Sequence, residues 1–268
     1  MTFKIDRSII LNLYCKFAFS SLEIGVFLYH IIHLQAEHCL LIDDAGPAPI
    51  CSALIYNPYR RYEVWRYISY FLTHAGWLHL ASNVTSQIVL GMLLEIINGW
   101  WRVGLIYLGG VLSGSLLTSV VDPRVYLVGA SGGVYALIAA HVPTLILNFR
   151  SMNSWLEWGI NLYVIGLGLF DVCHAIYIRY TAQSALAGSV GYAAHFGGAL
   201  GGFLLGVLIL KNIEVEKWET KLQVTCILVW TLGVAFAIIF NAVGGTAIYP
   251  RTDWGWIYDC SYKRFSGC

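Results

Sequence analysis

The chain has 268 residues, of which 58% are hydrophobic and only 12% are charged, and its formal net charge is +1. Soluble domains typically carry about 25% charged residues, so this composition excludes an ordinary soluble globular protein. The near-zero net charge also gives no basic surface for nucleic acid, and no nucleic-acid partner is expected. The composition therefore indicates a polytopic protein of the lipid bilayer.

Seven apolar segments are long enough to cross a membrane as helices, because a hydrocarbon core of about 30 Å needs roughly 20 such residues. They cover residues 13–34, 77–98, 103–121, 130–149, 156–178, 190–210 and 222–243. Backbone polar groups in lipid need partners within the protein, which favours helices over irregular chain. We therefore predict an all-α, polytopic membrane helix bundle with seven transmembrane helices.

The predicted organisation is a short N-terminal segment 1–12, a transmembrane domain 13–243 and a tail 244–268. The loop 35–76 contains three prolines and a charged aromatic cluster, NPYRRYEVWRY, so it is more than a plain linker. Three basic residues flank the start of the first span and none follows its end before Arg60. This asymmetry predicts a cytoplasmic N-terminus and a tail on the non-cytoplasmic side.

Seven cysteines are present, so at least one thiol is unpaired within a monomer. No CxxC pair occurs, and no metal site is expected. Whether Cys39 pairs with Cys51, or Cys260 with Cys268, stays open. Both pairs fall on the side predicted to be oxidising.

The fourth span begins with Gly129-Ala130-Ser131-Gly132-Gly133. Small neighbours leave the Ser131 hydroxyl accessible, and free N–H groups at a helix N-terminus suit a developing negative charge. The alternative is a packing patch of small residues, which is common in membrane helices.

The sixth span carries His195 on the same helical face as Gly198, Gly202 and Gly206. The glycines form a GxxxGxxxG groove that lets another helix approach until the backbones nearly touch. The imidazole is then pressed against that helix. The alternative is a histidine that hydrogen-bonds between helices for structure only.

The second span presents His79 and Asn83 at i, i+4 spacing, so both side chains share one face. Together they can donate hydrogen bonds to one oxygen atom, or they can simply hold helices together. The second, fourth and sixth spans cross in the same direction. His79, Asn83, Ser131 and His195 are therefore predicted at similar depth in the outer half of the bundle.

This group supports nucleophilic catalysis, because a neutral His195 within reach of Ser131 would take its proton. His79, Asn83 and the N–H of Ser131 would stabilise the oxyanion. Tyr135 lies one turn after Ser131 and would either stack on the imidazole or pack in the core. Spans four and six contain no Asp or Glu, which favours a Ser–His dyad over a triad. Hydrolysis requires water, so a polar cavity is expected.

Two carboxylates lie elsewhere in the spans. Glu95, within Gly91-x-x-x-Glu95-x-x-x-Gly99, is predicted to be structural, and Glu23 in the first span is given no role.

Five motifs in this order resemble those of the rhomboid intramembrane serine proteases. Gly129, Ser131 and Gly132 resemble the GxSG box, and His195, Gly198 and Gly202 resemble the AHxxGxxxG signature. The others are the HxxxN pair, the GxxxExxxG element and the WR motif of the first loop, at Trp65 and Arg66. The resemblance implies a rhomboid-like six-helix core plus one C-terminal helix, as in the animal secretase-type subgroup.

The resemblance also implies a function: cleavage of single-pass membrane proteins in or near their transmembrane segment, with release of ectodomains such as growth-factor precursors. It implies no cofactor, and a location in the secretory pathway (Golgi or endosome) or the plasma membrane. One alternative is a catalytically inactive rhomboid-like trafficking or binding protein, and another is a small transporter or channel. Substrate identity and oligomeric state stay open.

Overall fold

The computed structural model describes residues 14–36, 41–43, 46–49, 52–122, 125–152, 154–181 and 191–244. Within these ranges the long helices are α2 (Tyr14–Ala36), α4 (Trp77–Asn98), α5 (Trp100–Val121), α6 (Ser131–Asn148), α7 (Trp155–Thr181), α8 (Tyr192–Ile209) and α9 (Lys217–Ile239). Shorter elements are β1 (Leu41–Asp43), β2 (Gly46–Ala48), α3 (Arg66–Ser69), the 3₁₀ turn η1 (Tyr70–Leu72) and the π turn η3 (Phe240–Gly244).

Each predicted span coincides with one long helix, so the predicted membrane helix bundle is confirmed. Six of these helices are long and apolar enough to cross a membrane, while α2 contributes a shorter apolar stretch, Ala18–His33. The first loop adds a small antiparallel β1–β2 ladder. The predicted N-terminal segment, nearly all of the tail, and the four cysteines considered for pairing lie outside the described residues.

The start of α9 differs from the prediction. The span was expected from residue 222, but the helix begins at Lys217, within a run of charged residues that precedes the apolar stretch. The side chains of Glu216 and Glu219 form a capping box, which satisfies N–H groups at the first turn. Hydropathy alone misses this start because capping depends on polar side chains.

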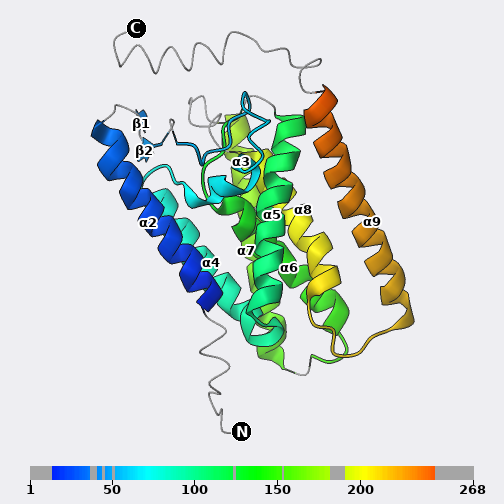
Figure 1. Ribbon diagram of the computed structural model, residues 1–268. Coiled ribbons are helices and arrows are strands. Elements are labelled where there is room, and N and C mark those ends of the chain that lie inside the picture. The colour runs from blue at the N-terminus through cyan, green and yellow to red at the C-terminus, as the bar shows by residue number, and fades with distance from the viewer. Residues whose placement is uncertain are drawn as a thin grey trace.

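The centre of the bundle is formed by α5, α6 and α8, with α2 and α9 at opposite edges (Figure 1). A Cβ at Gly198 would lie 2.1 Å from the carbonyl oxygen of Gly132, and one at Gly202 would lie 2.3 Å from that of Ala136. We call this contact, formed by Gly132, Ala136, Gly198 and Gly202, the α6–α8 seam. The predicted glycine groove therefore receives α6, and backbone meets backbone there.

Helix α2 is joined to the bundle by polar side chains. The Gln87 amide donates to Ser20 Oγ and to Glu23 Oε2, both at 2.9 Å. The Tyr107 hydroxyl bonds Gln87 Oε1 at 2.7 Å and Glu23 Oε1 at 3.3 Å. Glu23, Gln87 and Tyr107 are fully buried. Glu23 thus links α2 to α4 and α5, a role that the sequence did not reveal.

The outer helices α7 and α9 are less buried in the bundle. Only 17% of the apolar stretch of α7 and 11% of that of α9 are buried, against 67% for α6. A hydrogen bond between His141 Nδ1 and Asn161 Oδ1, 2.8 Å long, joins α6 to α7. On the other side, Trp230 Nε1 of α9 donates to Ser113 Oγ of α5 at 3.1 Å.

Candidate active site

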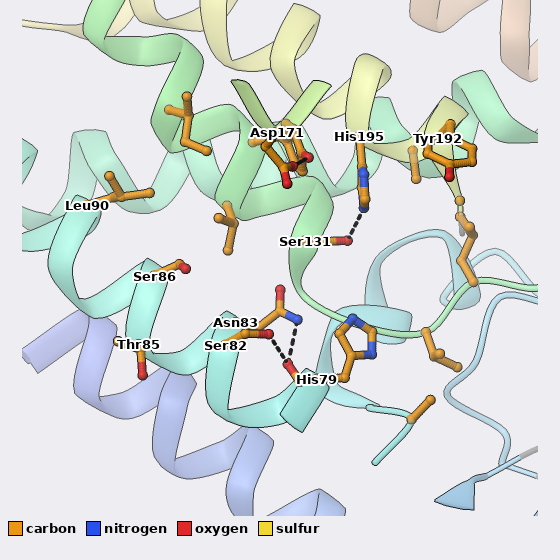
Figure 2. Close-up of a pocket in the computed structure, with 18 of the residues that line it drawn as sticks. His79, Ser82, Asn83, Thr85, Ser86, Leu90, Ser131, Asp171, Tyr192 and His195 are labelled. Carbon is orange, nitrogen blue, oxygen red and sulfur yellow. Dashed lines mark hydrogen bonds between the residues drawn. The ribbon is translucent and has the colours of Figure 1, made fainter. Parts of the chain in front are cut away.

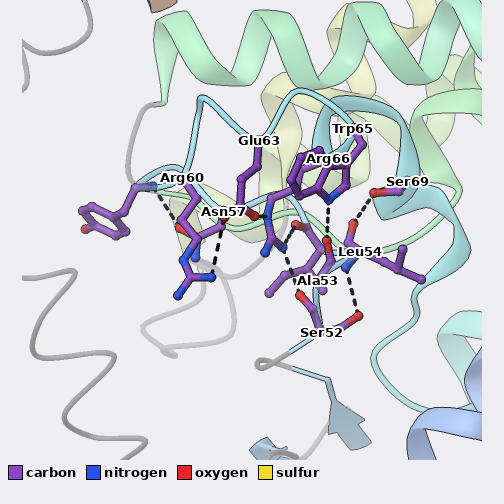
Figure 3. Close-up of polar contacts among 11 residues, drawn as sticks. Ser52, Ala53, Leu54, Asn57, Arg60, Glu63, Trp65, Arg66 and Ser69 are labelled. Atoms are coloured by element: carbon purple, nitrogen blue, oxygen red, sulfur yellow. Dashed lines mark hydrogen bonds and ion pairs between the residues drawn. The ribbon is translucent and has the colours of Figure 1, made fainter.

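The loop before α4 is organised by the Trp65-Arg66 pair (Figure 3). The buried Arg66 guanidinium donates to the carbonyl oxygens of Ser52 (3.0 Å) and Ile55 (2.8 Å) and pairs with Glu63 at 2.5 Å. The exposed Trp65 indole donates to a carbonyl oxygen of the same loop at 3.0 Å. Arg66 therefore fixes the course of the loop by satisfying backbone carbonyls and a carboxylate at once.

This loop holds the segment that leads into α6. Tyr56 and Leu127 exchange backbone hydrogen bonds of 3.1 and 3.2 Å. The carbonyl oxygen of Tyr70 accepts from the N–H of Gly129 at 3.3 Å, and its buried hydroxyl donates to Val111 O at 2.9 Å. The chain just before Ser131 is thus anchored to both the loop and α5.

Gly129 is required by its conformation and by its surroundings. Its φ is +105°, a region that other L-residues rarely adopt. A Cβ there would also lie 2.5 Å from Cε1 of His79. The glycine therefore lets the imidazole of α4 lie directly against the backbone that precedes the serine.

His74 also contacts the segment before Ser131, and the sequence did not reveal this role. The N–H of Ala130 donates to His74 Nε2 at 3.4 Å, and the rings of His74 and His79 lie 5.3 Å apart. Burial, helped by the nearby His79, lowers the pKa of His74 to about 3, so the ring is neutral and Nε2 accepts. His74 lies in the short connection before α4, where no helical periodicity marks it.

Ser131 and His195 are in direct contact (Figure 2). The distance from His195 Nε2 to Ser131 Oγ is 2.9 Å. Ser131 is the first residue of α6 and His195 lies in the first turn of α8, immediately before the α6–α8 seam. The close approach at Gly132 and Gly198 brings the hydroxyl and the imidazole together.

Tyr135 lies against the imidazole. The rings of Tyr135 and His195 are stacked, with centroids 4.3 Å apart and planes inclined by 16°. The Tyr135 hydroxyl donates to Asp171 Oδ2 of α7. Asp171 was also not predicted as a site residue, because it lies in the predicted fifth span and not in the fourth or sixth, which carry Ser131 and His195. The available signal was an aspartate within the predicted fifth span, where an ionisable group is costly.

His79 and Asn83 face the same space from α4 (Figure 2). The amide nitrogen of Asn83 donates to the carbonyl oxygen of His79 at 2.8 Å, and Ser82 Oγ donates to the same oxygen at 3.0 Å. The amide therefore bonds its own helix here rather than an oxygen at Ser131. The NH₂ group of Asn83 has two N–H donors, so one can stay bonded to His79 O while the other donates to an oxyanion.

All four of these predicted site residues, Ser131, His195, His79 and Asn83, line one open cavity of about 920 Å³. Its walls come from α4, α6, α7 and α8 and mix apolar side chains with Ser82, Thr85, Ser86, Asp171 and Tyr192. This volume is in the range of ligand-binding pockets and admits both a peptide segment and water.

The remaining predicted motif lies at the other end of α4. Gly99, with φ +83°, ends α4 and starts α5, and its N–H donates to Glu95 O at 2.8 Å. Gly91 and Glu95 are buried. Among the described residues, no group of three or more His, Cys, Asp or Glu is arranged to hold a metal ion.

Comparison with known sequences gives one family. Residues 61–212 match the rhomboid domain. The chain is 41% identical over 230 residues to "Rhomboid-related protein 1" of Caenorhabditis elegans, with 83% of this chain and 62% of that protein covered. It is 36% identical over 219 residues to "Rhomboid-related protein 2" of Mus musculus, with 82% of this chain and 71% of that protein covered.

A third relative is "Rhomboid-related protein 3" of Homo sapiens, 32% identical over 231 residues, with 85% of this chain and 56% of that protein covered. The chain therefore spans little more than half of the length of this relative and less than two thirds of the nematode one.

Proposed function

This chain belongs to the rhomboid family, and on that basis we propose that it is an intramembrane serine endopeptidase with Ser131 as nucleophile and His195 as general base. The observation that supports this most directly is the 2.9 Å contact between His195 Nε2 and Ser131 Oγ at the cavity wall. Serine becomes an effective nucleophile when such a base takes its proton.

The proposed reaction begins when His195 Nε2 accepts the hydroxyl proton and Ser131 Oγ attacks the carbonyl carbon of the scissile peptide. The resulting oxyanion accepts hydrogen bonds from the N–H of Ser131, from His79 and from Asn83, which donates the amide N–H that is not used by His79 O. His195 then gives its proton to the leaving amine, and water from the cavity hydrolyses the acyl-enzyme on Ser131.

The proposed substrates are single-pass membrane proteins, cut in or near their transmembrane segment. In support, Ser131 lies at the end of a membrane helix, and the cavity that it lines is walled by residues of α4, α6, α7 and α8. Cleavage there would release ectodomains, such as those of growth-factor precursors. We further propose a membrane of the secretory pathway (Golgi or endosome) or the plasma membrane, with a cytoplasmic N-terminus. No cofactor enters the scheme.

The test is cleavage of a co-expressed single-pass substrate by the wild-type chain and by Ser131→Ala and His195→Ala. Both variants should express normally and lose cleavage, because each removes one half of the dyad. A fluorophosphonate probe should label the wild-type protein and not Ser131→Ala. Near-normal cleavage by either variant would contradict the mechanism. A wild-type chain that neither cleaves nor takes the label would favour an inactive rhomboid-like binding protein.

A further inference from the structure

Asp171 stands out among the groups near the dyad. It is the only Asp, Glu, Lys or Arg among the described residues that line the cavity. It lies on α7, in a stretch apolar enough to cross a membrane. Ionisable side chains at such positions are costly and call for a functional reason.

The contacts of Asp171 lead to the dyad through one side chain. Its Oδ2 accepts from the hydroxyl of Tyr135, whose ring stacks on His195 at 4.3 Å. His195 Nε2 in turn lies 2.9 Å from Ser131 Oγ. A continuous series of contacts therefore runs from α7 through α6 to α8 and back to the serine.

The series constrains the imidazole for geometrical reasons. A tyrosine ring attached only at Cβ is free to turn about its side-chain torsions. A hydrogen bond at the hydroxyl holds the far end of the ring as well. The stacked imidazole then has a fixed surface on one face, and a ring rotation that would turn Nε2 away from Ser131 is hindered.

We propose that Asp171 is a positioning residue, which holds Tyr135 against His195 and so keeps the imidazole aligned with Ser131. The proposal rests on the proposed function. It also makes alignment of the dyad depend on where α7 lies, because α7 supplies the acceptor. α7 is mostly exposed, whereas α6 and α8 meet at the α6–α8 seam.

A second hydrogen bond between the same helices provides a matched control. His141 Nδ1 and Asn161 Oδ1 are 2.8 Å apart, and neither residue lines the cavity. Asn161→Leu and Asp171→Leu each remove one polar link between α6 and α7 with the same new side chain. Only Asp171→Leu affects a link that continues to His195.

The experiment measures kcat and KM for a single-pass substrate, and the rate of fluorophosphonate labelling, in the wild type and three variants. Asp171→Leu should lower kcat and the labelling rate about tenfold with KM unchanged, because misalignment of a reacting group slows chemistry without weakening docking. Asp171→Asn keeps an acceptor for Tyr135 and should restore kcat to within about threefold of wild type. Asn161→Leu should leave kcat and labelling unchanged.

The double variant Tyr135→Phe/Asp171→Leu sharpens the test. Tyr135→Phe keeps the stacked ring but removes the hydroxyl, so the two changes break the same bond. The double variant should therefore lose no more kcat than Asp171→Leu alone. A loss of kcat in the double variant equal to the product of the losses in Tyr135→Phe and Asp171→Leu would overturn the proposal.

The other outcomes decide the matter as well. Wild-type kcat and labelling in Asp171→Leu would overturn the proposal, as would a rise in KM alone, which would make Asp171 a substrate-binding group. An equal loss of kcat and labelling rate in Asn161→Leu would also overturn it, because Asp171 would then act only by holding α7 against α6. Each of these requires an active wild-type enzyme, whereas a wild type without cleavage or label would overturn the proposed function itself.

Discussion

The α6–α8 seam and the outward side of α7 both contain glycine among apolar residues, yet the glycines have opposite surroundings. A Cβ at Gly198 would lie 2.1 Å from a backbone oxygen, whereas a Cβ at Gly159 or Gly166 of α7 meets nothing within 4 Å. In the seam, the missing side chain sets the distance between two helices. At Gly159 and Gly166 it sets no such distance. Helices α6 and α8 are therefore a closely packed pair that holds the dyad, whereas α7 borders the cavity and is packed less closely.

The largest effect is expected from Gly198→Ala. The added methyl group would overlap the Gly132 carbonyl and push α8 from α6, costing about 1–3 kcal/mol of stability. Displacement of His195 from Ser131 should lower cleavage by about a hundredfold. A substrate cleavage assay and thermal unfolding in detergent measure the two effects.

Gly166→Ala is the matched control on α7. Its methyl group enters open space, so activity should be unchanged and helix stability should rise by up to about 1 kcal/mol. If Gly198→Ala behaved like Gly166→Ala, the distinction between the two regions would fail.

A smaller effect is expected from Asn83→Ala, on the α4 side of the cavity. Loss of one oxyanion donor among several should lower kcat by about ten- to a hundredfold and leave KM unchanged. Steady-state kinetics measure this change. Ser82→Ala removes a neighbouring hydroxyl that bonds the same carbonyl oxygen, and it should keep wild-type turnover. A wild-type kcat in Asn83→Ala would remove Asn83 from the proposed chemistry.

The smallest effect is expected at α9, the least buried of the six described helices that are long and apolar enough to cross a membrane. Trp230→Phe removes the hydrogen bond to Ser113 and should cost about 1 kcal/mol of stability, since a single net hydrogen bond contributes about that much. Turnover should not change, because neither Trp230 nor Ser113 lines the cavity. Thermal unfolding and the cleavage assay check both parts. A fall in turnover that follows the loss of stability would show that α9 supports the site.

Much of this architecture follows from local sequence. Apolar length predicted the seven helices, and glycine spacing predicted which face of α8 would approach another helix. The convergence of Ser131, His195 and His79 followed from the direction in which alternate spans cross. Helix length and glycine spacing depend on residues within one segment, and the convergence depends only on the order of the spans, which is why pattern and spacing reveal these features.

The features that were missed depend on pairs from distant segments. Asp171 meets Tyr135 from 36 positions away, and His74 reaches Ala130 across 56. No regular spacing in the sequence relates either pair, because only tertiary packing brings the partners together. The hydrogen bond from Asn83 to His79 O was missed for another reason: a side-chain amide has a competing acceptor within its own helix.

The buried Glu23 has a consequence for how the molecule is made. Its partners Gln87 and Tyr107 are synthesised 64 and 84 residues later. A carboxylate in the middle of a bilayer without partners costs about 2.5–3.5 kcal/mol. Before these partners are made, α2 is therefore poorly matched to lipid. Stable insertion of α2 therefore requires the later synthesis of α4 and α5, which makes assembly of this bundle cooperative.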